Sequence, residues 1–182
     1  MIYELENFLS SEVCLNIIDY FEHTSKRNTH ISGYFENRSL CPYEIEDLKI
    51  KKSLSIFQTK CIQTASKLYY SKNIDVNLYL EYWDVVKWEI GKSMEVHRDG
   101  INYEHSRDYS SVCYLNDDYI GGETFFPEND YLEYLCKPKT GKIVFFPSSR
   151  HHGVKKIQQG IRYSLPCWYS KNSKDIFLEI DC

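Results

Sequence analysis

The sequence lacks several features that mark particular classes of protein. It has no block of basic residues, and its 22 Lys and Arg stand against 26 Asp and Glu, for a net charge of -4. Proteins that grip the phosphate backbone need clustered positive charge, so no nucleic-acid partner is expected. No apolar run approaches the length of a membrane span, and the acidic N-terminus lacks the positive charge of a signal peptide. We therefore expect a cytoplasmic protein with no membrane partner.

The seven cysteines are scattered, and no two of them form a C-x-x-C pair. Zinc ribbons and thioredoxin-like redox sites use such pairs, so neither is indicated, and reduced thiols fit the pattern best. The sequence also has no internal repeat, low-complexity segment or domain linker. The 182 residues therefore predict a single domain, 1–182, with one core.

Helical periodicity is confined to the first part of the chain. Apolar residues recur between 13 and 21 after two serines, which predicts a capped amphipathic helix of about three turns. A longer amphipathic helix is predicted for about residues 45 to 70, where apolar residues stand three and four apart. Residues 23 to 43 show neither a helical nor a strand period, which makes this segment a candidate lid.

From residue 76 the apolar period changes to two, which predicts a long strand or a hairpin as far as residue 90. Short β-rich runs follow, separated by turn residues: SSVCYLN, ETFFP, KIVFFP and IRYSLPCWY. The chain is thus predicted to be α+β, with mainly helical support over 1–75 and a β barrel or sandwich over 76–170. The tail from about Lys171 is expected to extend beyond this core.

His97 and Asp99 form an H-x-D triplet. Residues two apart on a strand project from the same face, so the imidazole and the carboxylate can reach one metal ion while Arg98 points away. Non-haem Fe(II) oxygenases use two histidines and one carboxylate, and leave three metal positions open. A second histidine must then come from elsewhere. The alternative is a chance triplet on the surface.

Arg162 and Ser164 are also two residues apart on a predicted strand. A guanidinium can hold a carboxylate through two hydrogen bonds, and the serine can add a third, so the pair is a candidate carboxylate clamp. An arginine on a solvated strand face is the alternative, because periodicity does not decide which face is interior.

Residues 82 to 169 resemble the prolyl 4-hydroxylase group of Fe(II)/2-oxoglutarate oxygenases. Several motifs carry the resemblance, in order: W-x-x-G-x5-H-x-D from Trp88 to Asp99, Y-L-N from Tyr114, G-G-E-T-F-F-P from Gly121, and P-x-x-G-x5-P, H-x-V and G-x-R-Y-S between Pro138 and Ser164. Each motif alone is weak, but the ordered set is specific. The resemblance implies a double-stranded β-helix of the jelly-roll or cupin-like type, braced by the N-terminal helices.

The resemblance also implies the site. The distal histidine of the family lies in H-x-V, about ten residues before the basic co-substrate residue, and His152 fits that register better than the neighbouring His151. His97, Asp99 and His152 would then bind Fe(II). The distal carboxylate of 2-oxoglutarate would be held by Arg162, Tyr114 and Ser164. Trp88 stands where the family usually has a tyrosine, so it can wall the pocket but offers only an N–H donor.

O₂ is the second co-substrate that the resemblance implies, and ascorbate is a further cofactor candidate. The expected reaction is hydroxylation of a prolyl residue in a peptide or protein by a monomer or homodimer. Residues 23 to 43 and the loop 100–109 are the expected walls for this substrate. A free amino acid or another small molecule is the alternative substrate. A non-catalytic metal-binding jelly-roll module is the alternative from a different class.

Overall fold

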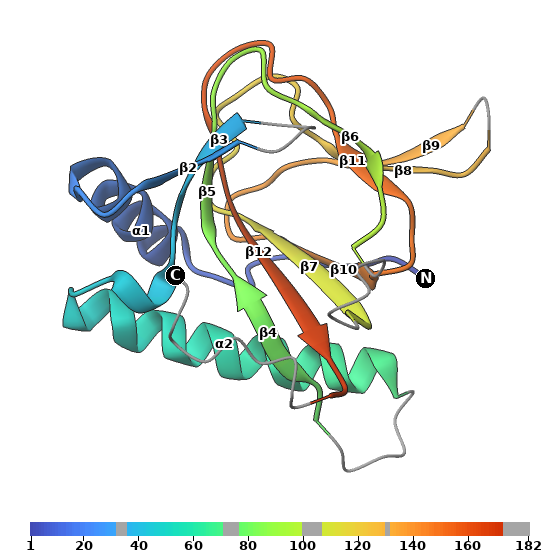
Figure 1. The fold of residues 1–182 in the computed structure, drawn as a ribbon, viewed down its shortest axis with the longest axis horizontal. Helices are drawn as coiled ribbons and strands as arrows, with labels where there is room; N and C mark the ends of the chain where they lie inside the picture. Colours follow the sequence, from blue (N-terminus) through green and yellow to red (C-terminus); the bar gives the residue numbers. More distant parts are fainter. Residues whose placement is uncertain (32–35, 71–76, 100–106, 130–131, 173–182) are drawn as a thin grey trace.

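The structure is a computed structural model that describes residues 1–31, 36–70, 77–99, 107–129 and 132–172, with the backbone alone at 28–31 and 36–38. Two helices are packed beside two antiparallel sheets (Figure 1). Helix α1 spans Ser11–His23 and helix α2 spans Leu48–Tyr69. The side chains of Ser10 and Asp47 cap these helices by accepting hydrogen bonds from backbone N–H groups. Both predicted helices are confirmed, and α2 begins later than expected because Asp47 is its cap.

The larger sheet has eight strands and the smaller sheet has four. The larger sheet runs β1-β10-β7-β12-β5-β3-β2, with β4 also paired to β12. Its strands are β1 (Tyr3–Leu5), β2 (Asn28–Ile31), β3 (Glu36–Leu40), β4 (Tyr79–Trp83), β5 (Val85–Trp88), β7 (Tyr109–Tyr114), β10 (Ile143–Pro147) and β12 (Arg162–Ser170). The smaller sheet runs β6-β11-β8-β9, with β6 (Met94–His97), β8 (Thr124–Pro127), β9 (Glu133–Cys136) and β11 (His152–Val154). A short 3₁₀ turn, η1 (Pro42–Glu44), precedes α2.

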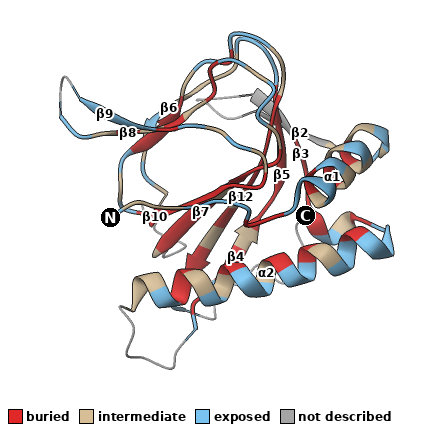
Figure 2. Ribbon diagram, turned by 180° about the vertical axis from the view of Figure 1, so that it is seen from behind, coloured by how far each residue is buried: buried red, intermediate tan, exposed pale blue. Residues whose placement is uncertain are grey.

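The helices cover one face of the larger sheet, and the smaller sheet lies across its other face (Figure 2). The main apolar core fills the layer between helices and sheet, where Phe21 and Phe57 of the helices and Leu165 of β12 are almost fully buried. Each such side chain contributes roughly 1.5–3 kcal/mol when it leaves water. The predicted α+β double-stranded β-helix, braced by the N-terminal helices, is confirmed.

Two segments that the sequence left open form strands of the larger sheet. Within residues 23 to 43, where no strand period was found, β2 and β3 pair with each other and β3 pairs with β5, so the described part of this segment extends the sheet. Residues 32–35 lie outside the described residues. Strands β4 and β5 both pair with β12 and not with each other, so residues 79 to 88 are one long strand broken at Asp84, not a hairpin.

Five of the cysteines are free and buried: Cys14, Cys61, Cys113, Cys136 and Cys167. Cys41 takes part in a disulfide, so the expectation of reduced thiols does not hold for that residue. Neither described helix combines the length and the apolar character that crossing a bilayer requires.

The buried carboxyl of Asp84, at the break between β4 and β5, makes the free energy of unfolding depend on pH. Asp84 is 4% exposed, and burial raises the pKa of its carboxyl to about 7. Since an unfolded aspartate ionises near pH 4, the folded chain holds a proton between about pH 4 and 7 that the unfolded chain has released. This contribution to the free energy of unfolding is present at low pH and is lost as the pH rises through about 7.

We expect thermal denaturation to show that Asp84→Asn is as stable as the wild type near pH 4 and more stable by a few kcal/mol at pH 8. The exposed control Asp19→Asn should follow the wild type. Parallel pH curves for wild type and Asp84→Asn would contradict this prediction.

Candidate active site

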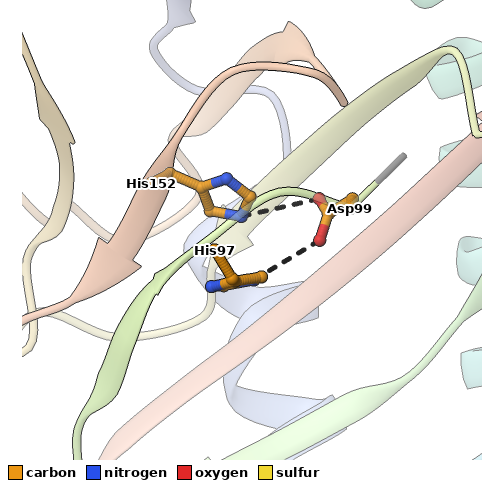
Figure 3. Close-up of side chains that lie close together, drawn as sticks. All are labelled: His97, Asp99 and His152. Carbon is orange, nitrogen blue, oxygen red and sulfur yellow. Dashed lines mark ion pairs between the residues drawn. The ribbon is translucent and has the colours of Figure 1, made fainter. Parts of the chain in front are cut away.

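Three side chains with metal-binding atoms meet where β6 and β11 pair (Figure 3). His97 is the last residue of β6, His152 is the first residue of β11, and the two residues are paired in the sheet. Asp99 lies just beyond the end of β6, with its carboxylate oxygens 3.5 Å from Nε2 of each histidine. All three ligand atoms lie within 4.8 Å of one another. Two imidazole nitrogens and one carboxylate oxygen are the donor set that non-haem Fe(II) oxygenases use.

Hydrogen bonds aim both imidazoles at the same point. Nδ1 of His97 is 2.9 Å from the carbonyl oxygen of Glu95, and Nδ1 of His152 is 2.9 Å from that of Arg150. A carbonyl oxygen only accepts, so each Nδ1 carries a proton, and in the neutral ring Nε2 is then the nitrogen with the lone pair. Hydrogen bonds from the nitrogen that does not bind the metal orient metal-binding histidines in proteins generally. Both Nε2 atoms are therefore available to one ion beside Asp99.

The side chains of the cluster shift one another's pKa values. Burial opposes ionisation of Asp99, but the hydrogen bond with His97, the charge of His152 and the Ser110 hydroxyl outweigh it and hold its pKa at about 2. Burial lowers the pKa of His152, although the charge of Asp99 opposes this shift. The carboxylate is thus ionised, and His152 favours the neutral form, which is the form that binds a metal.

A cavity of about 380 Å³ opens beside the three residues. It lies between the two sheets, and its walls come from both: Val86, Trp88, Met94, His97, Arg98, Asp99, Arg107, Ser110, Ser111, Val112, Thr124, Phe146, His152, Val154, Arg162, Ser164, Pro166 and Trp168. This volume suits a small organic acid together with part of a larger substrate.

Arg162 is a buried cation in this cavity and is only 2% exposed. Its guanidinium lies 5.4 Å from the Trp88 ring and 5.5 Å from the Tyr114 ring, and its Nη2 makes a long hydrogen bond of 3.5 Å to Thr124. Its Nε has no partner, and no carboxylate pairs with it among the described residues. Burying a cation without a counterion is costly, so this wall suits a bound anion.

The other residues predicted to bind 2-oxoglutarate differ in whether they line the cavity. Ser164 is buried and lines the cavity on the strand that carries Arg162, and Trp88 forms another part of the wall. Tyr114 does not line the cavity: its hydroxyl donates to Thr124 Oγ1 at 2.8 Å, and the carbonyl oxygen of Cys136 lies 3.3 Å from the same hydroxyl. Thr124 lines the cavity instead, and sequence reasoning missed it although it belongs to the G-G-E-T-F-F-P motif.

The backbone geometry at Gly121 and Gly122 explains the two glycines of the G-G-E-T-F-F-P motif. Both have positive φ, at +81° for Gly121 and +68° for Gly122. A Cβ at Gly121 would lie 2.1 Å from the Lys156 carbonyl oxygen, and one at Gly122 would lie 3.2 Å from Cδ of Arg162. The positive φ and the close approach favour glycine at both positions, which lie just before Thr124 and β8.

Arg98 corrects one expectation. It lines the cavity rather than pointing away, because the strand ends at His97 and strand alternation no longer applies. Trp168 also lines the cavity. The Arg107 guanidinium lies 4.6 Å from its ring, and Nε of Arg107 donates to both carboxylate oxygens of Glu81, at 3.0 and 3.1 Å. Residues 100–106 of the expected substrate wall lie outside the described residues.

The histidine that competed for the distal position is separated from the cluster. His151 is exposed and does not line the cavity, whereas His152 is 6% exposed and faces Asp99.

Comparison with known protein families agrees with this geometry. Residues 78–170 match the family model described as the 2OG-Fe(II) oxygenase superfamily. The chain belongs to the 2OG-Fe(II) oxygenase superfamily. Members of this family use Fe(II), 2-oxoglutarate and O₂, and the cluster and the buried arginine are suited to the first two. The matched region contains both histidines, Asp99 and the cationic wall of the cavity.

Individual relatives show how far the likeness extends. Human prolyl 3-hydroxylase 2 is 40% identical over 68 residues, which are 35% of this oxygenase chain and 10% of that protein, so the match covers only a small part of its length. The fold matches a Trichoplax adhaerens prolyl hydroxylase in complex with a hypoxia inducible factor peptide fragment, with TM-score 0.73, 16% identity, and 99% and 87% of the two chains covered. It also matches SnoN, a non-haem α-ketoglutarate-dependent epimerase, with TM-score 0.70, 13% identity, and 92% and 76% covered.

Proposed function

We propose that this chain is an Fe(II)- and 2-oxoglutarate-dependent dioxygenase that hydroxylates a prolyl residue in a peptide or protein. One observation carries the proposal: the His97, Asp99 and His152 cluster shares a cavity with Arg162, a buried cation that has no counterion among the described residues. A structural metal site would need the first feature but not the second. Both features together suit a metal and a dicarboxylic acid bound side by side.

The proposed roles follow from the positions of the residues. His97, Asp99 and His152 would hold Fe(II) through Nε2, a carboxylate oxygen and Nε2, respectively. Arg162 and Ser164 would hold the distal carboxylate of 2-oxoglutarate, and Thr124 joins them at the same wall. Tyr114 would act through Thr124, because its hydroxyl donates to that side chain and not into the cavity. The metal, 2-oxoglutarate and O₂ would supply the oxidising chemistry when bound.

The peptide substrate is supported by the similarity to prolyl hydroxylases and by the cavity lining. Trp168 and Arg107 both line the cavity, where the Arg107 guanidinium lies 4.6 Å from the Trp168 ring and is fixed by Glu81. A guanidinium can donate further N–H groups to a peptide carbonyl. A free small molecule is the alternative substrate, because the fold is shared with an epimerase of a different reaction class.

The setting of this activity belongs to the same proposal. We infer a cytoplasmic enzyme acting as a monomer or homodimer, with no nucleic-acid or membrane partner. The free thiols of the five buried cysteines agree with a reducing compartment, whereas the disulfide of Cys41 is not typical of one.

The first test is succinate release from 2-oxoglutarate with Fe(II) and O₂. We expect turnover by the wild type that rises severalfold when a proline-rich peptide is added, together with a gain of one oxygen atom on a prolyl residue by mass spectrometry. Stimulation by free proline or another small molecule, with no peptide modified, would favour the alternative substrate. A purified chain that binds neither Fe(II) nor 2-oxoglutarate would overturn the enzyme proposal itself.

A further inference from the structure

The Asp99 carboxylate is held from outside the sheet that carries the histidines. His97 and His152 belong to the smaller sheet, but the hydrogen-bond donor that reaches Asp99 is Ser110 of β7, in the larger sheet. The Ser110 hydroxyl donates to Oδ2 of Asp99 at 2.7 Å. Asp99 is therefore fixed from the opposite wall of the cavity.

A second serine determines the direction of this hydrogen bond. Oγ of Ser148 lies 2.7 Å from Oγ of Ser110, and both side chains are almost fully buried, at 0% and 1% exposed. A carboxylate only accepts, so the Ser110 proton goes to Asp99 and Ser148 must donate to Ser110. The hydroxyls thus form a one-way chain from Ser148 through Ser110 to Asp99.

Ser148 also holds the main chain of Asp99. The backbone N–H of Asp99 donates to the carbonyl oxygen of Ser148 at 3.0 Å. Asp99 lies beyond the end of β6, so no strand pairing holds it in place. These two contacts, one to the backbone and one to the carboxylate, replace the sheet as the support for this residue.

We propose that Ser110 is a positioning residue that fixes the Asp99 carboxylate for metal binding, and that Ser148 keeps Ser110 in its donating orientation. The proposal rests on the proposed metal centre. With Oδ2 engaged by Ser110, one carboxylate oxygen is left for the metal. A carboxylate free to rotate could bind through both oxygens and occupy a position that the co-substrates need.

Binding of Co(II) to the whole chain without 2-oxoglutarate tests this role, since its affinity and its visible absorption report the ligands directly. We expect Ser110→Ala to weaken Co(II) binding by about 10-fold and to change the absorption bands. Ser110→Thr, which keeps the hydroxyl, should restore most of the affinity, and Ser148→Ala should have a smaller effect in the same direction.

Ser111→Ala is the matched control. Ser111 is the neighbouring buried serine on β7, but its hydroxyl pairs with that of Tyr169 at 2.7 Å instead of with Asp99. It should lose a comparable amount of stability and keep wild-type Co(II) affinity. Should Ser110→Ala fail to fold, Ser148→Ala and Ser110→Thr carry the same comparison.

Two results would count against the proposal in distinguishable ways. Wild-type affinity and absorption in Ser110→Ala and Ser148→Ala would overturn the positioning role and leave the metal centre standing. A wild-type chain that binds no Co(II) would overturn the metal centre and, with it, this inference.

Discussion

Replacing His152 by alanine is expected to abolish Fe(II) binding, while replacing the adjacent His151 leaves it unchanged. His152 directs Nε2 toward Asp99 and is held by the Arg150 carbonyl, whereas His151 is exposed and outside the cavity. Residues that merely orient a metal ligand are worth about 10- to 100-fold in affinity, so loss of a ligand should exceed about 100-fold. Calorimetric titration with Fe(II) under anaerobic conditions measures the affinity of both variants.

This pair of variants separates a metal role from a general effect on folding. The two residues are adjacent in sequence, and the same alanine change is made at each. Succinate release should fall below detection in His152→Ala and stay at the wild-type rate in His151→Ala. The opposite pattern would mean that the distal ligand is His151 and that the register of β11 is wrong.

Replacing Arg162 by glutamine is expected to raise the KM for 2-oxoglutarate by about 30-fold or more. Removing one partner of a buried charge pair costs about 2–5 kcal/mol, and Arg162 is the buried cation through which the proposed dicarboxylate would bind. Arg162→Lys should recover part of the loss, because an ammonium keeps the charge but cannot form the paired hydrogen bonds of a guanidinium. Initial rates of succinate release at varied 2-oxoglutarate give KM and kcat separately.

Arg107→Gln is the control for this measurement. Arg107 lines the same cavity, but it is neutralised by Glu81 and its side chain is partly exposed. It should keep the KM for 2-oxoglutarate and weaken binding of the peptide. Equal effects of the two substitutions on the KM for 2-oxoglutarate would contradict the assignment of Arg162.

Arg162 is expected to lower the stability of the ligand-free chain although it is needed to bind 2-oxoglutarate. In the ligand-free chain its charge is buried without a counterion among the described residues, and its Nε is unpartnered. Arg162→Met should therefore unfold at an equal or higher temperature than the wild type without 2-oxoglutarate, although it binds the co-substrate poorly. A large loss of stability would show instead that stacking between Trp88 and Tyr114 is the main role of Arg162.

Local patterns were sufficient to predict much of the fold. Helix α1 was predicted because its cap and its apolar period are properties of residues three or four apart. The strands β7, β8, β10 and β12 were predicted because turn residues bound short β-rich runs. The strands β2, β3, β9 and β11 were missed because they are short and carry polar residues or glycine, so a period of two does not show.

For the candidate site, the sequence predicted which residues take part but not how they are arranged. The H-x-D triplet, the R-x-S pair and the ordered motifs all lie in the sequence, so the residues of the site could be named before the structure. Their arrangement could not. Asp99 was expected on a strand face, and the structure places it beyond the strand, where Ser110 and Ser148 support it.

The sequence by itself determined the secondary structure of the long elements, the family and the set of candidate ligands, because each depends on residue types at short, fixed spacings. Only the tertiary structure decided which of two adjacent histidines faces Asp99, that Tyr114 reaches the cavity wall through Thr124, and that Arg162 is buried without a counterion among the described residues. These properties depend on the pairing of β6 with β11 and on the closure of one sheet over the other. Both join residues that are far apart in the sequence, and no local pattern encodes the contacts between them.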